Sequence, residues 1–198
     1  MKEQILELRN DLKGRLTSSR FEHTVSVSFI CTALAMRYGC DLLKAELAGL
    51  LHDCAKPYGN DEIIKKCRRQ NLSLTDDEQK APVVLHAKYG AWLAENKYRI
   101  NDGEIINAIR WHTTGRPEMS TLEKIVFTAD YIEPRRDRAA NLSLIRSMAF
   151  VDLDESVYQI LKETLKYLEG KGCFVDSMSK QAYSYYKKVH EEKKGELG

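Results

Sequence analysis

Most of the chain repeats its apolar residues every three to four positions, a spacing typical of α-helices rather than strands. Five of these apolar stripes carry a histidine or an aspartate at one end. A titratable side chain on a buried stripe is unfavourable unless it is hydrogen-bonded, paired or bound to a metal. The fold is therefore expected to bring these polar residues together. They are His23, His52, His86, His112 and Asp130.

Each stripe can be followed in the sequence. His23 shares a helical face with Val27, Ile30 and Leu34. A single histidine in this position is most often a hydrogen-bonded core residue. Five stripes that end in the same two residue types favour one shared site instead. On the face of His52, small residues at Ala45 and Ala48 would let two helices approach closely.

The residue types in this set suit a metal. Asp53 follows His52 directly and adds a sixth candidate ligand. Neutral imidazole and carboxylate groups suit Zn, Fe, Mn, Co or Ni. Two adjacent ions would indicate a hydrolase of phosphate esters or anhydrides. We interpret Cys54, next to Asp53, as a small buried residue and not as a ligand. A His-Asp pair alone carries little weight, so the argument depends on the whole set.

The four prolines lie close to the candidate ligands. Proline marks helix starts and stops. Each ligand is therefore expected near a helix end, where side chains from several helices can converge on a cleft. The prolines are Pro57, Pro82, Pro117 and Pro134.

The periodicity predicts an all-α fold, a compact bundle of seven to nine helices in a single domain over residues 1–198. Residues 71–81 are expected to form a loop or short turn, and 132–151 a long excursion with one short helix. The charged tail, 191–198, is expected to fray. The predicted helices are 2–16, 20–38, 41–54, 60–70, 82–97, 102–112, 120–131, 152–170 and 177–192.

Composition narrows the class of protein. The 198 residues are enough for one domain with a real core, and the net charge of +2 makes nucleic acid an unexpected partner. No apolar run is long enough to span a membrane, and the first 20 residues lack a signal-peptide core. The five cysteines form no Cys-x-x-Cys motif, which favours reduced thiols in the cytoplasm.

Four sequence blocks, taken together, resemble a known family. RFEHT (20–24), LLHDCAKP (50–57), the histidine-containing segment 82–90 and IRWHTTGRPEMSTLEKIVFTADYIEPRR (109–136) occur in this order. The chain thereby resembles the HD-domain metal-dependent phosphohydrolases, and within them the YqeK branch, over roughly residues 15–190. One departure is Ala87, where a glycine is expected after His86.

The resemblance implies an HD-domain bundle that hydrolyses diadenosine tetraphosphate symmetrically to two ADP. It also implies two divalent metal ions, with iron favoured over Mn, Co, Ni or Zn. His23, His52, Asp53 and Asp130 would hold one ion. His86 and His112 would hold the other, with Asp53 as the bridge.

From the chemistry of such a site we expect a bridging hydroxide to attack phosphorus. Asp53, Lys56 and Arg116 are the candidate catalytic residues. The polyphosphate would be bound by nearby cations and hydroxyls, although the cations are equally plausible as solvated surface residues. Acceptors for the second ring nitrogen of each histidine could be Glu22, Asp102 or Glu123. The candidate substrate-binding residues are Lys56, Thr113, Thr114, Arg116, Arg135 and Arg136.

Other hypotheses remain open at this point. The expected ligand is a dinucleoside polyphosphate or a nucleoside diphosphate. The same metal core would also suit a nucleotidase, or a cyclic nucleotide or guanosine tetraphosphate hydrolase. The basic segment RRDR (135–138) motivates a nucleotide- or RNA-binding module instead, and a homodimer is a further hypothesis. Tyr89, Trp111 and Tyr131 are interpreted as core residues, and His190 is excluded from the site.

Overall fold

The computed structural model describes residues 2–137, 139 and 141–196. Within these residues the chain forms eleven α-helices and one 3-10 turn, and it has no strand. The all-α prediction is therefore confirmed. The elements are α1 (Lys2–Arg15), α2 (Ser18–Tyr38), α3 (Leu42–Leu51), α4 (Asn60–Arg69), α5 (Asp76–Lys80), η1 (Pro82–Val84), α6 (Leu85–Asn96), α7 (Gly103–Trp111), α8 (Thr121–Ile132), α9 (Leu142–Met148), α10 (Leu153–Gly170) and α11 (Ser177–Glu196).

The helix count exceeds the predicted seven to nine because of two short helices. Helix α9 is the short helix expected within 132–151. Helix α5 lies in 71–81, where a loop or short turn was predicted. It forms because Thr75 and Glu78 make a capping box, in which each side chain accepts from the other residue's backbone N–H. The remaining nine helices correspond to the nine predicted segments.

Two predicted boundaries differ from the structure. Helix α3 ends at Leu51 rather than at 54, and the chain continues in tight turns that place His52 and Asp53 side by side. Helix α11 continues to Glu196, four residues beyond the predicted end at 192. Lys193 contacts both carboxylate oxygens of Asp152 at 2.8 Å and ties this end of α11 to the start of α10. Residues 197–198 lie outside the described part.

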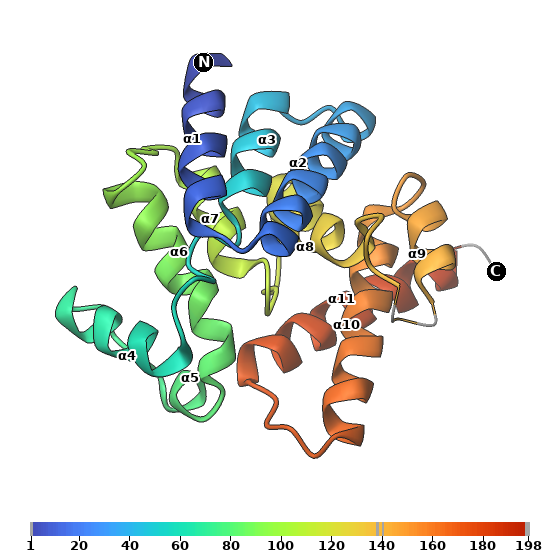
Figure 1. The fold of residues 1–198 in the computed structure, drawn as a ribbon. Coiled ribbons are helices and arrows are strands. Elements are labelled where there is room, and N and C mark those ends of the chain that lie inside the picture. The colour runs from blue at the N-terminus through green and yellow to red at the C-terminus, as the bar shows by residue number, and fades with distance from the viewer. Residues whose placement is uncertain (1, 138, 140, 197–198) are drawn as a thin grey trace.

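Helix α8 lies between the two halves of the bundle (Figure 1). On one side it packs against α2, α3 and α7, and on the other against α9 and α10. Helix α11 packs against α10. The apolar core runs through these contacts, so the residues at the C-terminal end of α8 lie close to both halves.

Helices α2 and α3 approach each other very closely. Ala45 and Ala48 are fully buried, as the close packing predicted for this face requires. At Gly49 a Cβ would come within 2.7 Å of the Ser28 Cα atom, so any side chain there would push the helices apart. This contact brings the face of α2 that carries His23 towards the end of α3. In the described residues, no helix is long and apolar enough to cross a membrane.

Candidate metal centre

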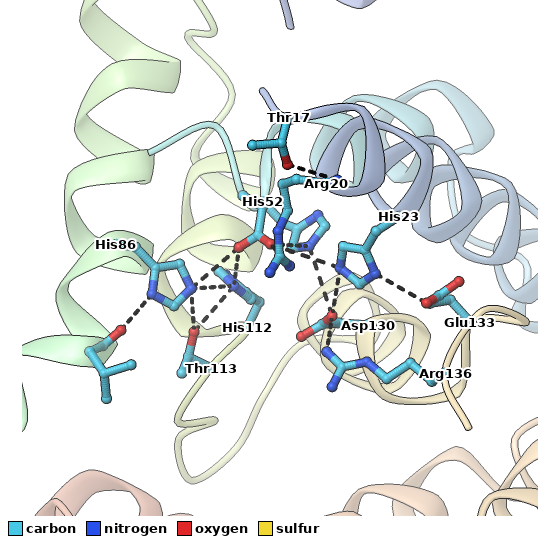
Figure 2. A network of polar contacts seen from close by, with 12 residues as sticks. Thr17, Arg20, His23, His52, His86, His112, Thr113, Asp130, Glu133 and Arg136 are labelled. Carbon is cyan, nitrogen blue, oxygen red and sulfur yellow. Dashed lines mark hydrogen bonds and ion pairs between the residues drawn. The ribbon is translucent and has the colours of Figure 1, made fainter. Parts of the chain in front are cut away.

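The six candidate ligands come together in one cluster, although they come from five separate parts of the bundle. Figure 2 labels the four histidines and Asp130. His23 lies in the second turn of α2 and His86 in the first turn of α6. His52 and His112 are the C-cap residues that directly follow α3 and α7, and Asp53 follows His52. Asp130 lies in the last turn of α8. All four histidines and Asp53 are buried, and the side chain of Asp130 is 21% exposed.

Three of the histidines are oriented in the same way. Each uses Nδ1 to contact the backbone carbonyl three residues earlier. Because a carbonyl only accepts, Nδ1 carries the proton in the neutral ring and Nε2 presents a lone pair. In all three, Nε2 faces the cluster. The contacts are His52 to Gly49 O at 2.7 Å, His86 to Val83 O at 2.6 Å and His112 to Ile109 O at 2.7 Å.

The acceptors proposed from the sequence are therefore wrong. Asp102 caps α7 by accepting from the backbone N–H groups of Glu104 and Ile105. Glu123 belongs to the capping box of α8. Glu22 is half exposed and lies 3.6 Å from the guanidinium of Arg135. Backbone carbonyls take the expected role because each of these histidines lies near a helix end and can reach back over one turn.

Glu133 orients the fourth histidine, and sequence reasoning missed it. His23 Nδ1 contacts Glu133 Oε1 at 3.2 Å, and Glu133 is 2% exposed. The backbone N–H of Arg135 donates to the other carboxylate oxygen. A carboxylate that fixes a histidine ring is a usual companion of a metal ligand. The available signal was the three-residue spacing from Asp130, about one helical turn.

Asp53 lies between two pairs of histidines, and each of its oxygens faces one pair. Oδ2 is 3.5 Å from His52 Nε2 and 3.8 Å from His23 Nε2. Oδ1 is 3.4 Å from His86 Nε2 and 3.7 Å from His112 Nε2. Burial raises the pKa of this carboxyl, but the surrounding histidines outweigh it and hold the pKa well below its usual range. Asp53 is therefore an anion at neutral pH.

Asp130 completes the half of the cluster formed by His23 and His52. Its Oδ1 is 3.1 Å from His23 Nε2 and 3.9 Å from His52 Nε2. These three residues can offer ligand atoms that all lie within 4.8 Å of one another, and so can His52, Asp53 and His112. The geometry thus contains two overlapping groups that share His52.

The residues fit divalent metal ions. Among the described side chains, the buried Nε2 atoms of His23 and His52 have no hydrogen-bond partner. Buried polar atoms are normally satisfied, and unpaired ones call for an explanation such as an ion. Four imidazole nitrogens and two carboxylates match the preferences of Zn, Fe, Mn, Co and Ni. Burial, together with the neighbouring His112, lowers the pKa of His86 to about 3, so its ring is neutral.

Two arginines contact the cluster carboxylates. Arg136 Nη2 donates to Asp130 Oδ1 at 2.7 Å. Arg136 therefore lies beside the cluster, where it was expected from the sequence. Arg20 Nη1 donates to Asp53 Oδ2 at 2.8 Å and was not among the candidates. The signal was its place three residues before His23, on the same helical face. Both arginines also line the cleft beside the cluster.

The other predicted contact residues differ in position. Thr113 Oγ1 lies 3.1 Å from Nε2 of both His86 and His112. Lys56 is partly buried near Asp53, and burial lowers its pKa. Arg135 is exposed at the cleft.

The structure does not bring Arg116 and Thr114 to the cleft. The guanidinium of Arg116 makes two 2.7 Å bonds to Glu123, which is 1% exposed. The hydroxyl of the buried Thr114 donates to Gly115 O. Both side chains are held by local contacts, Arg116 with the first turn of α8 and Thr114 within the turn that precedes this helix.

Several other sequence interpretations can be located. Cys54 is buried and its thiol donates to Gly90 O, in keeping with a structural role. The five cysteines are free. Tyr89 is buried and stacks on Trp92. His190 contacts Glu155 at 2.6 Å on α10 and is not part of the cluster. In the segment RRDR, residue 138 lies outside the described part.

A cleft of about 1050 Å³ opens beside the cluster. At its inner end lie His23, His112 and Asp130, together with Thr113. Arg20, Arg135 and Arg136 also line it, so guanidinium groups lie beside the histidine and carboxylate groups of the cluster.

The profile of the HD domain matches residues 20–135, which is more than half of the chain and contains all six clustered residues. The chain belongs to the HD-domain family. The family blocks noted in the sequence thus coincide with the helices that supply the cluster. In this HD-domain protein, α9, α10 and α11 lie beyond the matched region and form the outer wall of the bundle.

Curated relatives cover most of the HD-domain protein. It is 40% identical over 164 residues to a protein of Halalkalibacterium halodurans named bis(5'-nucleosyl)-tetraphosphatase, symmetrical, covering 81% of this chain and 84% of that one. It is 38% identical over 162 residues to a Bacillus subtilis protein of the same name, covering 81% and 85%.

A solved structure has the same fold. It is described as a predicted HD superfamily hydrolase involved in NAD metabolism from Clostridium acetobutylicum. The two structures superpose with a TM-score of 0.89 at 35% identity, over 92% of this chain and 96% of the other.

Proposed function

We propose that this HD-domain protein binds two divalent metal ions and hydrolyses dinucleoside tetraphosphates at the central anhydride. Diadenosine tetraphosphate would give two ADP. The proposal is supported by the 40% and 38% identity to proteins named symmetrical bis(5'-nucleosyl)-tetraphosphatases. It is supported independently by the arrangement of the six clustered side chains.

The observation that carries the proposal is the position of Asp53. Its Oδ2 faces His23 and His52, and its Oδ1 faces His86 and His112. A carboxylate with one oxygen towards each of two ligand groups is suited to bridge two cations. Asp130 would complete the first group. We therefore assign His23, His52, Asp53 and Asp130 to one ion, and His86, His112 and Asp53 to the other.

Divalent cations bound here would lower the pKa of water towards neutrality and neutralise charge on the phosphates. In the neutral rings, the contact that each Nδ1 makes leaves Nε2 with the lone pair that can bind a cation. Thr113 can orient an oxygen at the His86–His112 side through its hydroxyl. Attack of water at one of the two central phosphorus atoms breaks the central P–O–P bond, and each half leaves as a nucleoside diphosphate.

The inner end of the cleft supplies the charge that a polyphosphate needs. Arg20 and Arg136 hold their guanidinium groups at Asp53 and Asp130 and can bind phosphate oxygens in the planar fashion typical of arginine. Lys56 and Arg135 are further candidates at the rim. We assign no direct substrate contact to Arg116 or Thr114, because their side chains are engaged in contacts around the start of α8.

Several features complete the proposal. Iron is the favoured metal, with Mn, Co, Ni or Zn able to use the same ligands. The whole chain acts as one domain in the cytoplasm, where its five free cysteines stay reduced. The homodimer stays a prediction, and its test is the mass of the protein in solution by light scattering.

The test is a product analysis. Protein loaded with Fe(II) or Mn(II) is incubated with diadenosine tetraphosphate, and the products are resolved by ion-exchange chromatography. We expect ADP as the sole product and no turnover by Asp53→Ala. Asp61→Ala is the matched control, because Asp61 is exposed at the start of α4.

Other outcomes would contradict the proposal. AMP with ATP would show asymmetric cleavage. An intact substrate with every metal, together with turnover of another nucleotide, would favour one of the alternative phosphohydrolases. RNA affinity that falls steeply with salt and no turnover at all would favour a binding module.

A further inference from the structure

The cleft extends well beyond the cluster, and its outer wall is one face of α10. Four residues of this wall, Ile160, Glu163, Thr164 and Tyr167, follow the i, i+3, i+4, i+7 spacing that places side chains on the same side of a helix. Helix α10 packs against α8, which carries Asp130. The outer wall is therefore held rigidly relative to the candidate metal centre.

The outer end differs chemically from the inner end. Its floor is apolar, because Ile160 and Phe127 are 2% and 5% exposed. Tyr167 is 64% exposed, so its aromatic ring is presented to solvent at the edge of the cleft. An exposed aromatic side chain beside an apolar floor is a feature of surfaces that bind planar ligands.

The polar groups at the outer end suit a neutral ligand. Tyr131 donates its hydroxyl to Asn141 Oδ1 at 2.8 Å, so the group that Asn141 can offer a ligand is its NH2. The pKa of Tyr131 is raised mainly by burial and, to a smaller extent, by the nearby carboxylate of Glu163. A carboxylate repels phosphate and accepts hydrogen bonds from hydroxyl or amino groups.

The cleft thus changes from arginines and candidate metal ligands at one end to an aromatic ring, an amide and a carboxylate at the other. Arg20 and Arg136 bracket the inner end, and Glu163 and Tyr167 the outer end. A volume of about 1050 Å³ accommodates more than a chain of phosphates and is at the upper limit of ordinary small-molecule sites. A nucleotide has this same polarity, with charged phosphates at one end and a neutral, planar base at the other.

We propose that the α10 wall is the nucleoside subsite of this enzyme, with Tyr167 as the stacking platform for the base and with Glu163 and Asn141 as its polar contacts. This assignment rests on the proposed function, because the phosphates are placed at the metal centre. Such a subsite would favour a nucleotide over an inorganic polyphosphate. Tyr167 and Glu163 are then residues of specificity, not of catalysis.

The test compares two ligands that share phosphates and differ in the nucleoside. ADP and inorganic pyrophosphate are titrated by calorimetry into protein loaded with Mn(II), with Mn(II) in excess for both. Base stacking on an aromatic side chain contributes about 1–3 kcal/mol, roughly 5- to 150-fold in affinity. We expect Tyr167→Ala to weaken ADP binding about tenfold or more and to leave pyrophosphate binding unchanged. Tyr167→Phe should retain the ADP affinity.

Two more variants complete the design. Glu163→Gln should weaken ADP binding and spare pyrophosphate. Phe174→Ala is the matched control, because Phe174 is an exposed aromatic outside the cleft and its loss should change neither affinity. In steady-state assays with diadenosine tetraphosphate, Tyr167→Ala should raise KM with little change in kcat, which a general folding defect would not do.

Three results would contradict the subsite. The affinity for ADP could be the same in wild type, Tyr167→Ala and Glu163→Gln. The variants could lose affinity for ADP and for pyrophosphate equally, or the wild type could bind neither ADP nor pyrophosphate. Failure of the reaction is a separate result. Protein that leaves diadenosine tetraphosphate intact, yet loses ADP affinity selectively in Tyr167→Ala, would retain the subsite and overturn the proposed function.

Discussion

The Nε2 atoms of His86 and His112 lie 3.1 Å apart, although His86 belongs to α6 and His112 directly follows α7. Both rings donate from Nδ1 to a backbone carbonyl, so both Nε2 atoms present lone pairs. Two lone pairs at this distance repel unless a cation or a donor lies between them. The Thr113 hydroxyl can donate to one of them, and a metal ion would satisfy both.

In the proposed two-ion site, an ion at His86 and His112 would be separable from its neighbour. We expect His86→Ala to bind one metal ion per chain where the wild type binds two, because His23, His52 and Asp130 are untouched. Asp53→Asn, which weakens the ligand shared by both ions, should bind neither firmly. Elemental analysis by mass spectrometry after gel filtration measures the ratio. Equal metal content in His86→Ala and wild type would contradict the two-ion assignment.

Glu133 should control metal affinity without being a ligand. Glu133→Gln keeps the size of the side chain but removes the charge that fixes His23. Loss of such an orienting contact typically lowers metal affinity about 10- to 100-fold. Competition with a chelating dye measures the affinity. Glu22→Gln, at a half-exposed position, is the control and should behave as wild type.

Arg116 and Arg136, two of the three arginines assigned from the sequence to phosphate binding, should have different effects. Arg136→Ala should lower kcat/KM about 100-fold, the usual range for removing a donor to developing charge, with little change in Tm. Arg116→Ala should lower the free energy of unfolding by about 1–3 kcal/mol, because it leaves the buried carboxylate of Glu123 without its partner. Paired kinetics and thermal unfolding distinguish them. A stable Arg116→Ala protein with a large loss of kcat/KM would restore Arg116 to the site.

Gly49 should be essential to the contact between α2 and α3. In Gly49→Ala the new Cβ would meet the backbone of Ser28 at 2.7 Å, so the helices must separate. Such overpacking costs about 1–3 kcal/mol of stability. Gly14→Ala is the control, because its Cβ would meet nothing within 4 Å. Urea unfolding of both variants tests this, and equal stability would show that the helices move apart freely.

The ion pair between Asp152 and Lys193 should make stability depend on pH. Burial alone would raise the pKa of Asp152. Hydrogen bonds from Lys193 and from the backbone N–H of Glu155 have the larger combined effect, so the folded-state pKa lies below the usual 3.8. This stabilisation is present above the pKa of the unfolded chain and is lost as pH falls through the lower folded-state pKa.

Asp152→Asn tests this, because asparagine still caps α10 but carries no charge. The variant should be less stable than wild type at pH 7, and the difference should shrink as pH falls below about 4. Unfolding in urea at several pH values measures it. A difference that is constant with pH would show that the charge of Asp152 contributes nothing.

Much of the metal centre could be predicted from the sequence. Helical periodicity is a local property, so stripes ending in His23, His52, His86, His112 and Asp130 could be recognised without knowing how the helices pack. The turn that follows Leu51 and the capping box at Thr75 were harder to predict, because a few local hydrogen bonds decide where a helix ends or begins.

The sequence by itself determined the helical class, the six clustered residue types and their order along the chain. The tertiary structure decided which side chains meet them. His23 and Glu133 are 110 residues apart in the chain. The α10 wall faces the cluster because α10 packs on α8. Such contacts join segments that are distant in the chain, so the spacing of residues within one segment does not specify them.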